Sequence, residues 1–250
     1  MSRARVVYKV GGPALEDPDL VKPLADEVRR AQTDADVALV HGGGRQIERL
    51  LKQLAIEAKF VDGRRVTSPE AMEAVEMVLS GTMNKGLAAG LSSAGVAAIG
   101  ISGRDGGLLR ASLVPGLGRV GTPAKVDPAI IEALWAARLV PVISPVSNGP
   151  SGEATNVNAD EAAQWIARAL GAETLVFLSD VDGVLLDGAS VTHLDSMTIE
   201  RRTSDGAIHG GMAMKVRMAL DAARSGIGSV VIAGRARLSG GFPGTRVSVN

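Results

Sequence analysis

One stretch decides the fold, Val6-Val7-Tyr8-Lys9-Val10-Gly11-Gly12. Its apolar residues predict a buried strand from Val6 to Val10, and the glycine pair ends that strand in a loop. A lysine within an otherwise apolar strand is costly unless its ammonium group meets an anion. The alternative is a lysine at a strand edge, whose apolar stem is buried while its charge reaches water. This stretch by itself leaves both interpretations open.

Strands of the same kind recur along the chain. Short apolar runs predict them at 37–40, 96–101, 140–143, 175–178, 230–233 and 246–249. Helical patterns of about 10 to 15 residues alternate with these runs. A capping residue followed by proline marks three helix starts, Asp17-Pro18, Ser68-Pro69 and Asp127-Pro128. The alternation predicts an α/β fold with a mainly parallel sheet between two layers of helices, and the glycine- and proline-rich residues 105–124 predict hairpins.

Composition narrows the class of protein. The 250 residues can bury a full core, and we expect one domain over 1–250, with one lobe to about residue 150 and a second from about 151. With 46% hydrophobic and 2% aromatic residues, that core is aliphatic. Basic and acidic residues balance at 27 each, so we expect neither nucleic acid nor a membrane surface as a partner.

Several kinds of site are excluded or not expected. The sequence has no cysteine, which excludes disulfides, thiolate zinc sites and cysteine nucleophiles. The three histidines, His41, His193 and His209, show no metal-ligand spacing, so we expect no metal held by the protein itself. The N-terminus lacks the apolar core of a signal peptide, and no apolar run reaches the length of a membrane span. We therefore expect a cytoplasmic protein.

Two loops at predicted strand ends favour an anion. His41-Gly42-Gly43-Gly44 joins a strand to a helix, and its glycines let backbone N–H groups approach a phosphate or carboxylate closely. It matches neither the dinucleotide fingerprint nor the P-loop, and a plain flexible turn is the alternative. The second loop, Asn156-Val157-Asn158-Ala159-Asp160, precedes a helix. Asp160 is either the N-cap of that helix or a functional carboxylate.

Two basic residues join these loops. Lys215 follows Gly210-Gly211 near the start of a helix, where its charge opposes the helix dipole unless it faces an anion. Arg65, in a short apolar-flanked segment, can bind a carboxylate through two N–H groups, although Arg64 beside it weakens the signal. A solvated surface lysine is the alternative for Lys215. Together the strand-end glycines and the lysines predict binding and transfer of a phosphoryl group.

Taken in order, these segments resemble the amino acid kinase family, and they span nearly the whole chain. Within the family, the resemblance is to members that act on N-acetyl-L-glutamate. The resembling segments are Lys9–Gly12, His41–Gly44, Gly63–Thr67, Asn156–Asp160, Ser179–Val184, Gly211–Lys215 and Gly244–Arg246. The family fold is a three-layer α/β/α sandwich with a mainly parallel eight-stranded sheet. Its N-terminal lobe binds the amino acid and forms dimers, and its C-terminal lobe binds ATP.

The resemblance implies roles for the matching positions. Lys9 and Lys215 would stabilise the transferred phosphoryl group, and Asp160 would organise both lysines. Gly43 and Gly44 would cradle the substrate and the γ-phosphate, and Arg65 and Asn156 would hold N-acetyl-L-glutamate. ATP, carrying Mg²⁺, would bind the remaining predicted residues, which are Gly11, Gly12, Asp180, Val181, Asp182, Gly183, Val184, Leu185, Ala207, Ile208 and His209. The reaction would be phosphorylation of the γ-carboxylate in arginine biosynthesis.

Alternatives remain. A kinase for a one-carbon-longer aminoadipate derivative, of lysine biosynthesis, would need nearly the same residue types. A non-catalytic sensor of amino acid or nucleotide would keep the fold, although two lysines and Asp160 favour an enzyme. We expect a homodimer formed through the helix that begins at Ser68-Pro69, which carries an aliphatic stripe. Relatives inhibited by arginine carry an extra N-terminal helix, whereas the first strand here begins about five residues after Met1, so we expect no inhibition by arginine.

Overall fold

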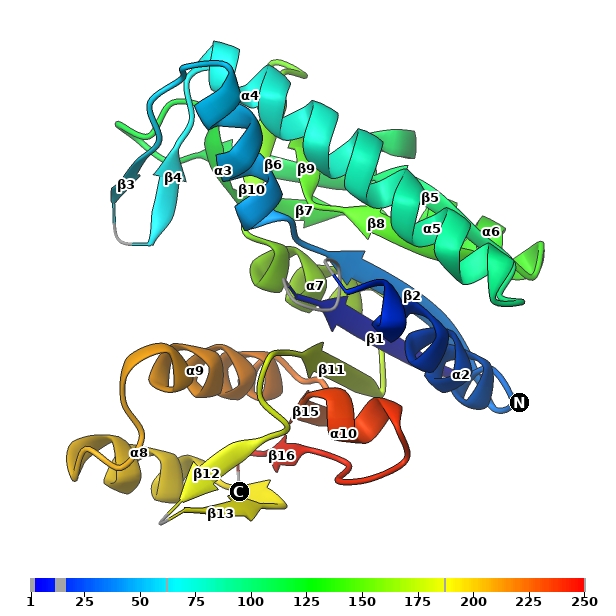
Figure 1. Cartoon of the computed structure of the whole chain (residues 1–250), viewed down its shortest axis with the longest axis vertical. Coiled ribbons are helices and arrows are strands. Elements are labelled where there is room, and N and C mark those ends of the chain that lie inside the picture. Colours follow the sequence, from blue (N-terminus) through cyan, green and yellow to red (C-terminus); the bar gives the residue numbers. More distant parts are fainter. Residues whose placement is uncertain (1–2, 12–16, 62, 187, 250) are drawn as a thin grey trace.

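The computed structural model describes residues 3–11, 17–61, 63–186 and 188–249. Within them the largest sheet has eight strands (Figure 1). In spatial order these are β14 (His193–Leu194), β16 (Thr245–Val247), β15 (Ser229–Ala233), β11 (Thr174–Leu178), β1 (Ala4–Val10), β2 (Ala35–His41), β8 (Val140–Ser144) and β5 (Ala98–Ser102). β15 and β16 pair antiparallel, and the other neighbouring strands pair in parallel. The predicted mainly parallel sheet is thus confirmed.

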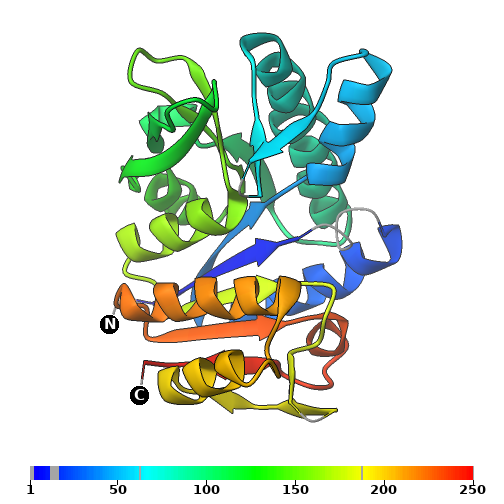
Figure 2. The same cartoon turned by 90° about the vertical axis from the view of Figure 1, so that its left-hand side faces the viewer.

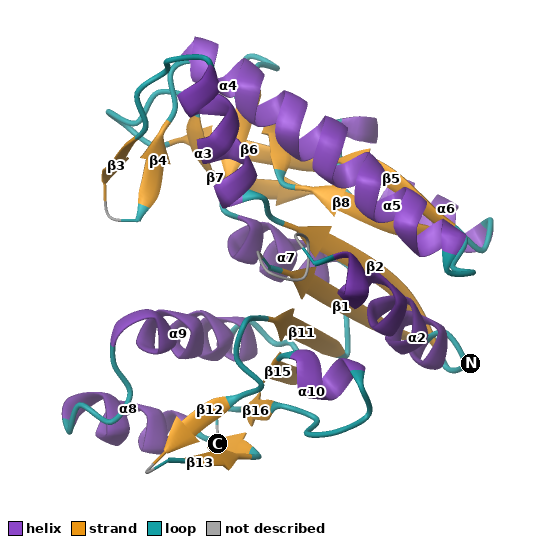
Figure 3. Cartoon of the chain, in the orientation of Figure 1, coloured by secondary structure: helices purple, strands orange, loops and turns teal. Residues whose placement is uncertain are grey.

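Helices cover both faces of this sheet, as the colouring by element type makes visible (Figure 3). One face packs against α6 (Ala129–Ala136), α7 (Ala159–Ala169), α8 (Ser196–Ser204) and α9 (Gly210–Arg224). The other packs against α2 (Val21–Ala31), α5 (Asn84–Ser93) and α10 (Arg235–Leu238). Apolar residues fill each interface because parallel strands are buried on both sides. The three-layer α/β/α sandwich expected from the sequence is therefore the observed fold.

The alternation of side chains along β1 orients Lys9. Val7 belongs to the core on the α7 side of the sheet, whereas Tyr8 and Val10 belong to the core on the α2 side. Successive side chains of a strand point to opposite faces, so Lys9 shares the face of Val7. Lys9 therefore points toward α7, and Tyr8 points toward α2.

A smaller layer lies beyond β8. The strands β6 (Leu109–Leu113), β7 (Val120–Val126), β9 (Val146–Asn148) and β10 (Ala154–Val157) close into a small barrel. The antiparallel pair β6–β7 confirms the predicted hairpin. Against the barrel pack α3 (Gly44–Gln53), α4 (Pro69–Glu76) and the π-helical segment Met77–Met83. Two further hairpins project from the chain, β3 (Lys59–Val61) with β4 (Arg64–Val66), and β12 (Val184–Leu186) with β13 (Ala189–Val191).

The predicted helix starts are mostly seen. The Ser68 hydroxyl caps α4 by accepting the Ala71 N–H, as expected. A 3-10 turn, Pro18–Leu20, precedes α2, so the helix proper begins later than Asp17-Pro18 predicted. The turned view shows the strands of the large sheet running side by side through the middle of the molecule (Figure 2). No helix among the described residues is both long and apolar enough to span a membrane.

Candidate active site

Three cavities follow one another along the carboxyl ends of the parallel strands, the edge where such folds bind ligands. The hairpin cavity, about 280 Å³, lies between the β3–β4 hairpin, the glycine loop 42–44 and β10. The central cavity, about 270 Å³, is lined by both lysines, Asp160 and Asp180. The loop cavity, about 470 Å³, is lined by 180–183 and by α9 and the turn before it. Lys9, Gly11 and Asp160 border both of the first two cavities, and Asp180 borders the last two.

Lys9 is held by a carboxylate. Its Nζ lies 2.8 Å from Oδ1 of Asp160, and the two side chains are 16% and 28% exposed. The glycine at position 11 leaves room beside this pair, because a Cβ there would lie 3.2 Å from Nζ of Lys9 and 3.1 Å from the Leu178 carbonyl oxygen, closer than ordinary contact. The lysine is thus neither at a strand edge nor free in solvent, and the functional interpretation of its position gains support.

Asp160 is free for this role because another residue caps the helix. The N-cap of α7 is Asn158, whose Oδ1 accepts the N–H groups of Asp160 (2.8 Å) and Glu161 (3.3 Å). The alternative in which Asp160 is merely the N-cap is therefore wrong. Its carboxylate lies in the first turn of α7 and faces the central cavity, where it meets Lys9.

Lys215 has its own partners across the central cavity. Its Nζ donates to Oδ1 of Asp180 and to the Ser179 hydroxyl, each at 2.5 Å. Hydrogen bonds from Lys215 and Ser179 lower the pKa of Asp180 to about 2. In this structure the two lysines therefore pair with different carboxylates, and the expectation that Asp160 organises both stays a prediction. Ser179 was not among the predicted site residues, although its place at the end of β11 was a signal.

The glycine loop gives the hairpin cavity a positive backbone wall. Gly43 is the N-cap of α3 and Gly44 its first residue. Since a glycine offers no side chain to the first N–H groups, these can serve a ligand oxygen, with the helix dipole adding attraction. A Cβ at Gly43 would lie 2.8 Å from Cδ2 of Leu79, so only glycine fits that position without movement. Both predicted glycines thus line the hairpin cavity.

A buried histidine, His41, supports this loop. Burial lowers the pKa of His41 to about 4, so the ring is neutral at physiological pH. Its Nδ1 lies 2.9 Å from the Gly42 carbonyl oxygen and its Nε2 lies 3.0 Å from Nδ2 of Asn84, which also donates to the Val142 carbonyl. The proton is therefore assigned to Nδ1. Asn84 is buried and contacts His41, and no pattern in the sequence had marked it.

The surroundings of the Arg65 guanidinium group suit the binding of an anion. It is 7% exposed and stacks over Phe60, with the guanidinium carbon 4.6 Å from the ring centre. Its Nη2 donates to the Gly44 carbonyl and to Glu48, each at 3.3 Å. Its Nη1 is buried and has no hydrogen-bond partner among the described residues. A buried N–H without a partner is costly, so a ligand oxygen at this point would remove the penalty.

Two further residues complete the hairpin cavity. Asn156, from β10, donates to the Thr67 hydroxyl at 3.3 Å and lines the cavity, while its role in holding the substrate stays a prediction. Arg64, which the sequence did not single out, also lines it and binds Oε1 of Glu161 at 2.6 Å. Burial raises the pKa of Glu161, with Arg64 opposing that rise. This ion pair fastens the β3–β4 hairpin to α7 beside Asp160.

The predicted nucleotide residues gather around the loop cavity. Its walls include Asp180, Val181, Asp182, Gly183, Leu185, Ala207 and His209. Val184 and Ile208 are buried beneath it, at 0% and 1% exposure, and support the walls rather than line them. Gly11 lies apart from these residues, at the central cavity, and its N–H donates to the Leu178 carbonyl. Gly12, also predicted to bind ATP, falls outside the described residues.

The arrangement of the acidic side chains bears on how a metal ion could bind at this site. Across the described ranges, no group of three or more His, Asp or Glu side chains could hold a metal ion. The two carboxylates at the central cavity, Asp160 and Asp180, are each paired with a lysine. A Mg²⁺ ion that arrives on nucleotide phosphates needs few protein ligands. The residues present therefore fit a metal carried by the phosphates.

Known proteins match this chain over nearly its full length. The sequence pattern of the amino acid kinase family matches residues 4–234. An acetylglutamate kinase from Rubrobacter xylanophilus is 46% identical over 244 residues, which are 97% of this chain and 94% of the relative. Another from Granulibacter bethesdensis is 43% identical over 249 residues, covering 93% and 84% of the two chains. A crystal structure of a Streptococcus mutans protein has a TM-score of 0.79 at 25% identity and covers 98% and 99%.

The chain therefore belongs to the amino acid kinase family, as its motifs indicated. Within that family, the relatives that it matches at 41 to 46% identity are acetylglutamate kinases. The fold expected from the resemblance, an α/β sandwich around an eight-stranded sheet, is also the fold observed.

Proposed function

We propose that this chain transfers the γ-phosphoryl group of ATP to the γ-carboxylate of N-acetyl-L-glutamate, forming N-acetyl-L-glutamyl 5-phosphate for arginine biosynthesis. Near-full-length identity to acetylglutamate kinases supports the choice of substrate. The observation that carries the mechanism is the single cavity shared by Lys9 and Lys215, which lies between the hairpin cavity and the loop cavity.

The chemistry fits a site without a general base. The nucleophile is a carboxylate, with an ordinary pKa of about 4.3, and is already ionised near neutral pH. One of its oxygens attacks the γ-phosphorus while the bond from that phosphorus to the bridging oxygen of ADP breaks. The protein has to align the two groups and offset negative charge. Two ammonium groups facing one cavity, together with a phosphate-bound Mg²⁺, supply that offset.

The acceptor occupies the hairpin cavity in this proposal. The unpartnered Nη1 of Arg65 offers an N–H to the α-carboxylate, and Asn156 holds the acetylated end. The γ-carboxylate then extends toward Lys9, which borders both this cavity and the central one. The N–H groups of Gly43 and Gly44 face the transferred group. These assignments rest on the cavity walls and on the charge of each residue.

ATP occupies the loop cavity, with its phosphates directed past Asp180 into the central cavity. Leu185, 56% exposed, offers an apolar surface for the base, and the turn before α9 supplies Ala207 and His209. Lys215, in the second turn of α9, then faces the γ-phosphate. In this arrangement the part of the chain to about residue 150 binds the amino acid, and the part from about 151 binds ATP. A cytoplasmic location belongs to the same proposal.

A homodimer is also part of the proposal, but the aliphatic stripe from which the sequence predicted it does not support it. The aliphatic stripe that follows Ser68 is core packing, because Met72, Val75 and Leu79 are at most 3% exposed and lie in one core cluster. Met77 on the same segment is 62% exposed, and β5 is the edge strand of the large sheet. These two features, rather than the stripe, support pairing between copies.

An assay with several acceptors tests the proposed function. ADP formation is measured with N-acetyl-L-glutamate, L-glutamate, N-acetyl-L-aspartate and an N-acetylated aminoadipate at equal concentrations. We expect kcat/KM for N-acetyl-L-glutamate to exceed the others by roughly tenfold or more. For the aspartate and aminoadipate derivatives this is the scale of a one-methylene change in a fitted pocket, and L-glutamate lacks the acetyl group altogether. A higher value for the aminoadipate derivative would move the assignment to lysine biosynthesis. Absence of turnover with every acceptor, combined with tight binding of a ligand, would favour a sensor.

A further inference from the structure

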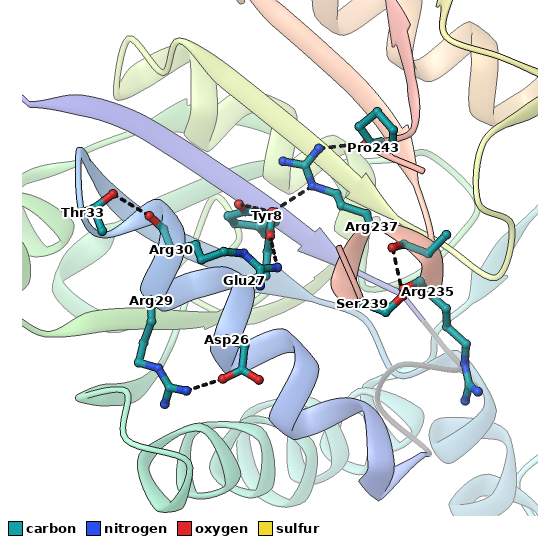
Figure 4. Close-up of polar contacts among 11 residues, drawn as sticks. Tyr8, Asp26, Glu27, Arg29, Arg30, Thr33, Arg235, Arg237, Ser239 and Pro243 are labelled. Atoms are coloured by element: carbon teal, nitrogen blue, oxygen red, sulfur yellow. Dashed lines mark hydrogen bonds and ion pairs between the residues drawn. The ribbon is translucent and has the colours of Figure 1, made fainter. Parts of the chain in front are cut away.

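A buried polar network lies on the face of the sheet opposite the site (Figure 4). Its centre is Glu27 of α2, which is 7% exposed. Oε1 of Glu27 accepts hydrogen bonds from the Tyr8 hydroxyl and from Nε of Arg237, each at 2.9 Å. Oε2 accepts from Nη2 of Arg30 at 2.8 Å. The network therefore joins three elements, β1, α2 and α10.

The electrostatics of this network favour an ionised centre. Burial raises the pKa of Tyr8, and the neighbouring Glu27 raises it further, so the phenol stays a donor. Burial alone would raise the pKa of Glu27, but the bond from Arg30 and the charge of Arg237 outweigh it and lower the pKa. Arg237 is 24% exposed, whereas Arg30 is 54% exposed. Removing one partner of a buried charge pair is costly because the other charge stays buried and unpaired.

The helix that carries Arg237 also holds one side of the nucleotide loop. The Ala236 N–H, at the start of α10, donates to Oδ1 of Asp182 at 2.7 Å. The loop lies so close to this helix that a Cβ at Gly234 would be 2.5 Å from the Val181 carbonyl oxygen. Asp182 and Val181 both line the loop cavity. The position of α10 therefore fixes one wall of that cavity.

Arg237 reaches the other side of the loop as well. Its Nη1 donates to the Pro243 carbonyl at 2.9 Å. Two residues further on, the Thr245 hydroxyl oxygen accepts the Val184 N–H at 2.8 Å. The loop 181–184 is thus held at Asp182 by the start of α10 and at Val184 by the start of β16. Arg237 directly follows Ala236, which binds Asp182, and it binds the Pro243 carbonyl two residues before Thr245. Its hydrogen bond to Glu27 connects this region to α2 in the N-terminal half of the chain.

We propose that Arg237 is a positioning residue for the nucleotide. It fixes the loop 181–184 by binding Glu27 and the Pro243 carbonyl, and so ties the ATP-binding wall to the strand that carries Lys9. Tyr8 precedes Lys9 on β1 and binds the same carboxylate, so the network sets the nucleotide wall relative to the phosphoryl-transfer lysine. This inference rests on the proposed function for the identity of the nucleotide, and it goes beyond it in assigning residues remote from all three cavities.

Two matched variants test it, Arg237→Gln and Arg30→Gln. Each removes one guanidinium group from the same carboxylate, but Arg30 lies on α2, the helix of Glu27 itself, whereas Arg237 lies on α10. We expect Arg237→Gln to weaken ATP binding about tenfold, by calorimetry and in KM, with KM for N-acetyl-L-glutamate within about twofold of wild type. Arg30→Gln should leave both constants near the wild-type values. A general loss of packing would instead alter both substrates alike.

The outcome that overturns the proposal is equal change in both constants, or an unchanged affinity for ATP, in folded Arg237→Gln. Should this variant fail to fold, Arg237→Lys replaces it, because lysine keeps the charge beside Glu27 and loses the second nitrogen that reaches Pro243. The same result is then expected of Arg237→Lys: weaker binding of ATP with nearly unchanged KM for N-acetyl-L-glutamate. Calorimetry with ATP alone does not depend on the acceptor. Wild-type protein that binds ATP but does not phosphorylate N-acetyl-L-glutamate would therefore refute the proposed function and leave the test of Arg237 valid.

Discussion

Lys9 and Asp160 form an ion pair between β1 and α7, with Nζ 2.8 Å from Oδ1. Asn158 caps α7 and so leaves the Asp160 carboxylate available to Lys9, and position 11 carries no side chain that would crowd the ammonium group. Both side chains are largely buried, so water screens the pair less than it would on the surface. The ammonium group is thereby held at the boundary of the hairpin and central cavities, where the acceptor and the phosphate would meet.

Loss of either lysine should act mainly on the chemical step. We expect Lys9→Ala and Lys215→Ala each to lower kcat by roughly 10²–10³-fold, since one electrostatic donor to a transition state contributes about 3–4 kcal/mol. KM for both substrates should change much less. Steady-state kinetics measures the split. Near wild-type kcat in either variant would remove that lysine from the phosphoryl-transfer site, and Lys125→Ala, at an exposed position of β7, is the matched surface control.

Arg65 should act on the acceptor alone. Replacing it in Arg65→Lys keeps the charge and loses the planar fork, so KM for N-acetyl-L-glutamate should rise about tenfold while KM for ATP stays nearly constant. Arg110→Lys, at an exposed position of β6, should change neither constant. If Arg65→Lys weakened both substrates equally, Arg65 would not belong to the acceptor site.

Gly11 should be intolerant of even one methyl group. In Gly11→Ala the new Cβ would lie 3.2 Å from Nζ of Lys9 and 3.1 Å from a carbonyl oxygen, so the ammonium has to move. We expect kcat to fall at least tenfold, because small displacements of catalytic groups are costly. Gly86→Ala is the control, since among the described atoms a Cβ there meets open space on a helix and should stabilise by about 0.5–1 kcal/mol. Equal kcat in both variants would contradict the role given to Gly11.

His41 should make stability depend on pH. Its pKa is lowered from 6.5 to about 4 by burial, so between these values the unfolded chain binds a proton that the folded chain does not. The free energy of unfolding is therefore highest above pH 6.5 and falls as the pH drops from 6.5 toward 4. At pH 4 it is lower by about 3 kcal/mol. Denaturant unfolding at several pH values measures it. The slope should be smaller in His41→Gln and nearly unchanged in His193→Gln, an exposed site; a wild-type slope in His41→Gln would contradict a buried neutral ring.

The sequence predicted local features well and distant pairings poorly. Apolar runs predicted seven of the eight strands of the large sheet, and the two-residue strand β14 was missed because it is too short to leave a pattern. The Ser68 cap was read correctly because its signal lies within four residues. The closed barrel was missed, since β10 pairs with β7 and β9 through contacts that no local pattern encodes. The site residues were found as separate motifs. Their partners were not, because Lys215 meets Asp180 and Arg64 meets Glu161 only after the chain folds.

The central claim is that γ-phosphate passes to a carboxylate across the cavity shared by the two lysines. The most direct measurement is ³¹P NMR of wild-type protein incubated with ATP, Mg²⁺ and N-acetyl-L-glutamate. The account predicts that an acyl-phosphate signal appears together with ADP in equal amounts, and that hydroxylamine removes it by forming a hydroxamate. ADP that accumulates with inorganic phosphate alone from the earliest times, or no loss of ATP at all, would contradict it.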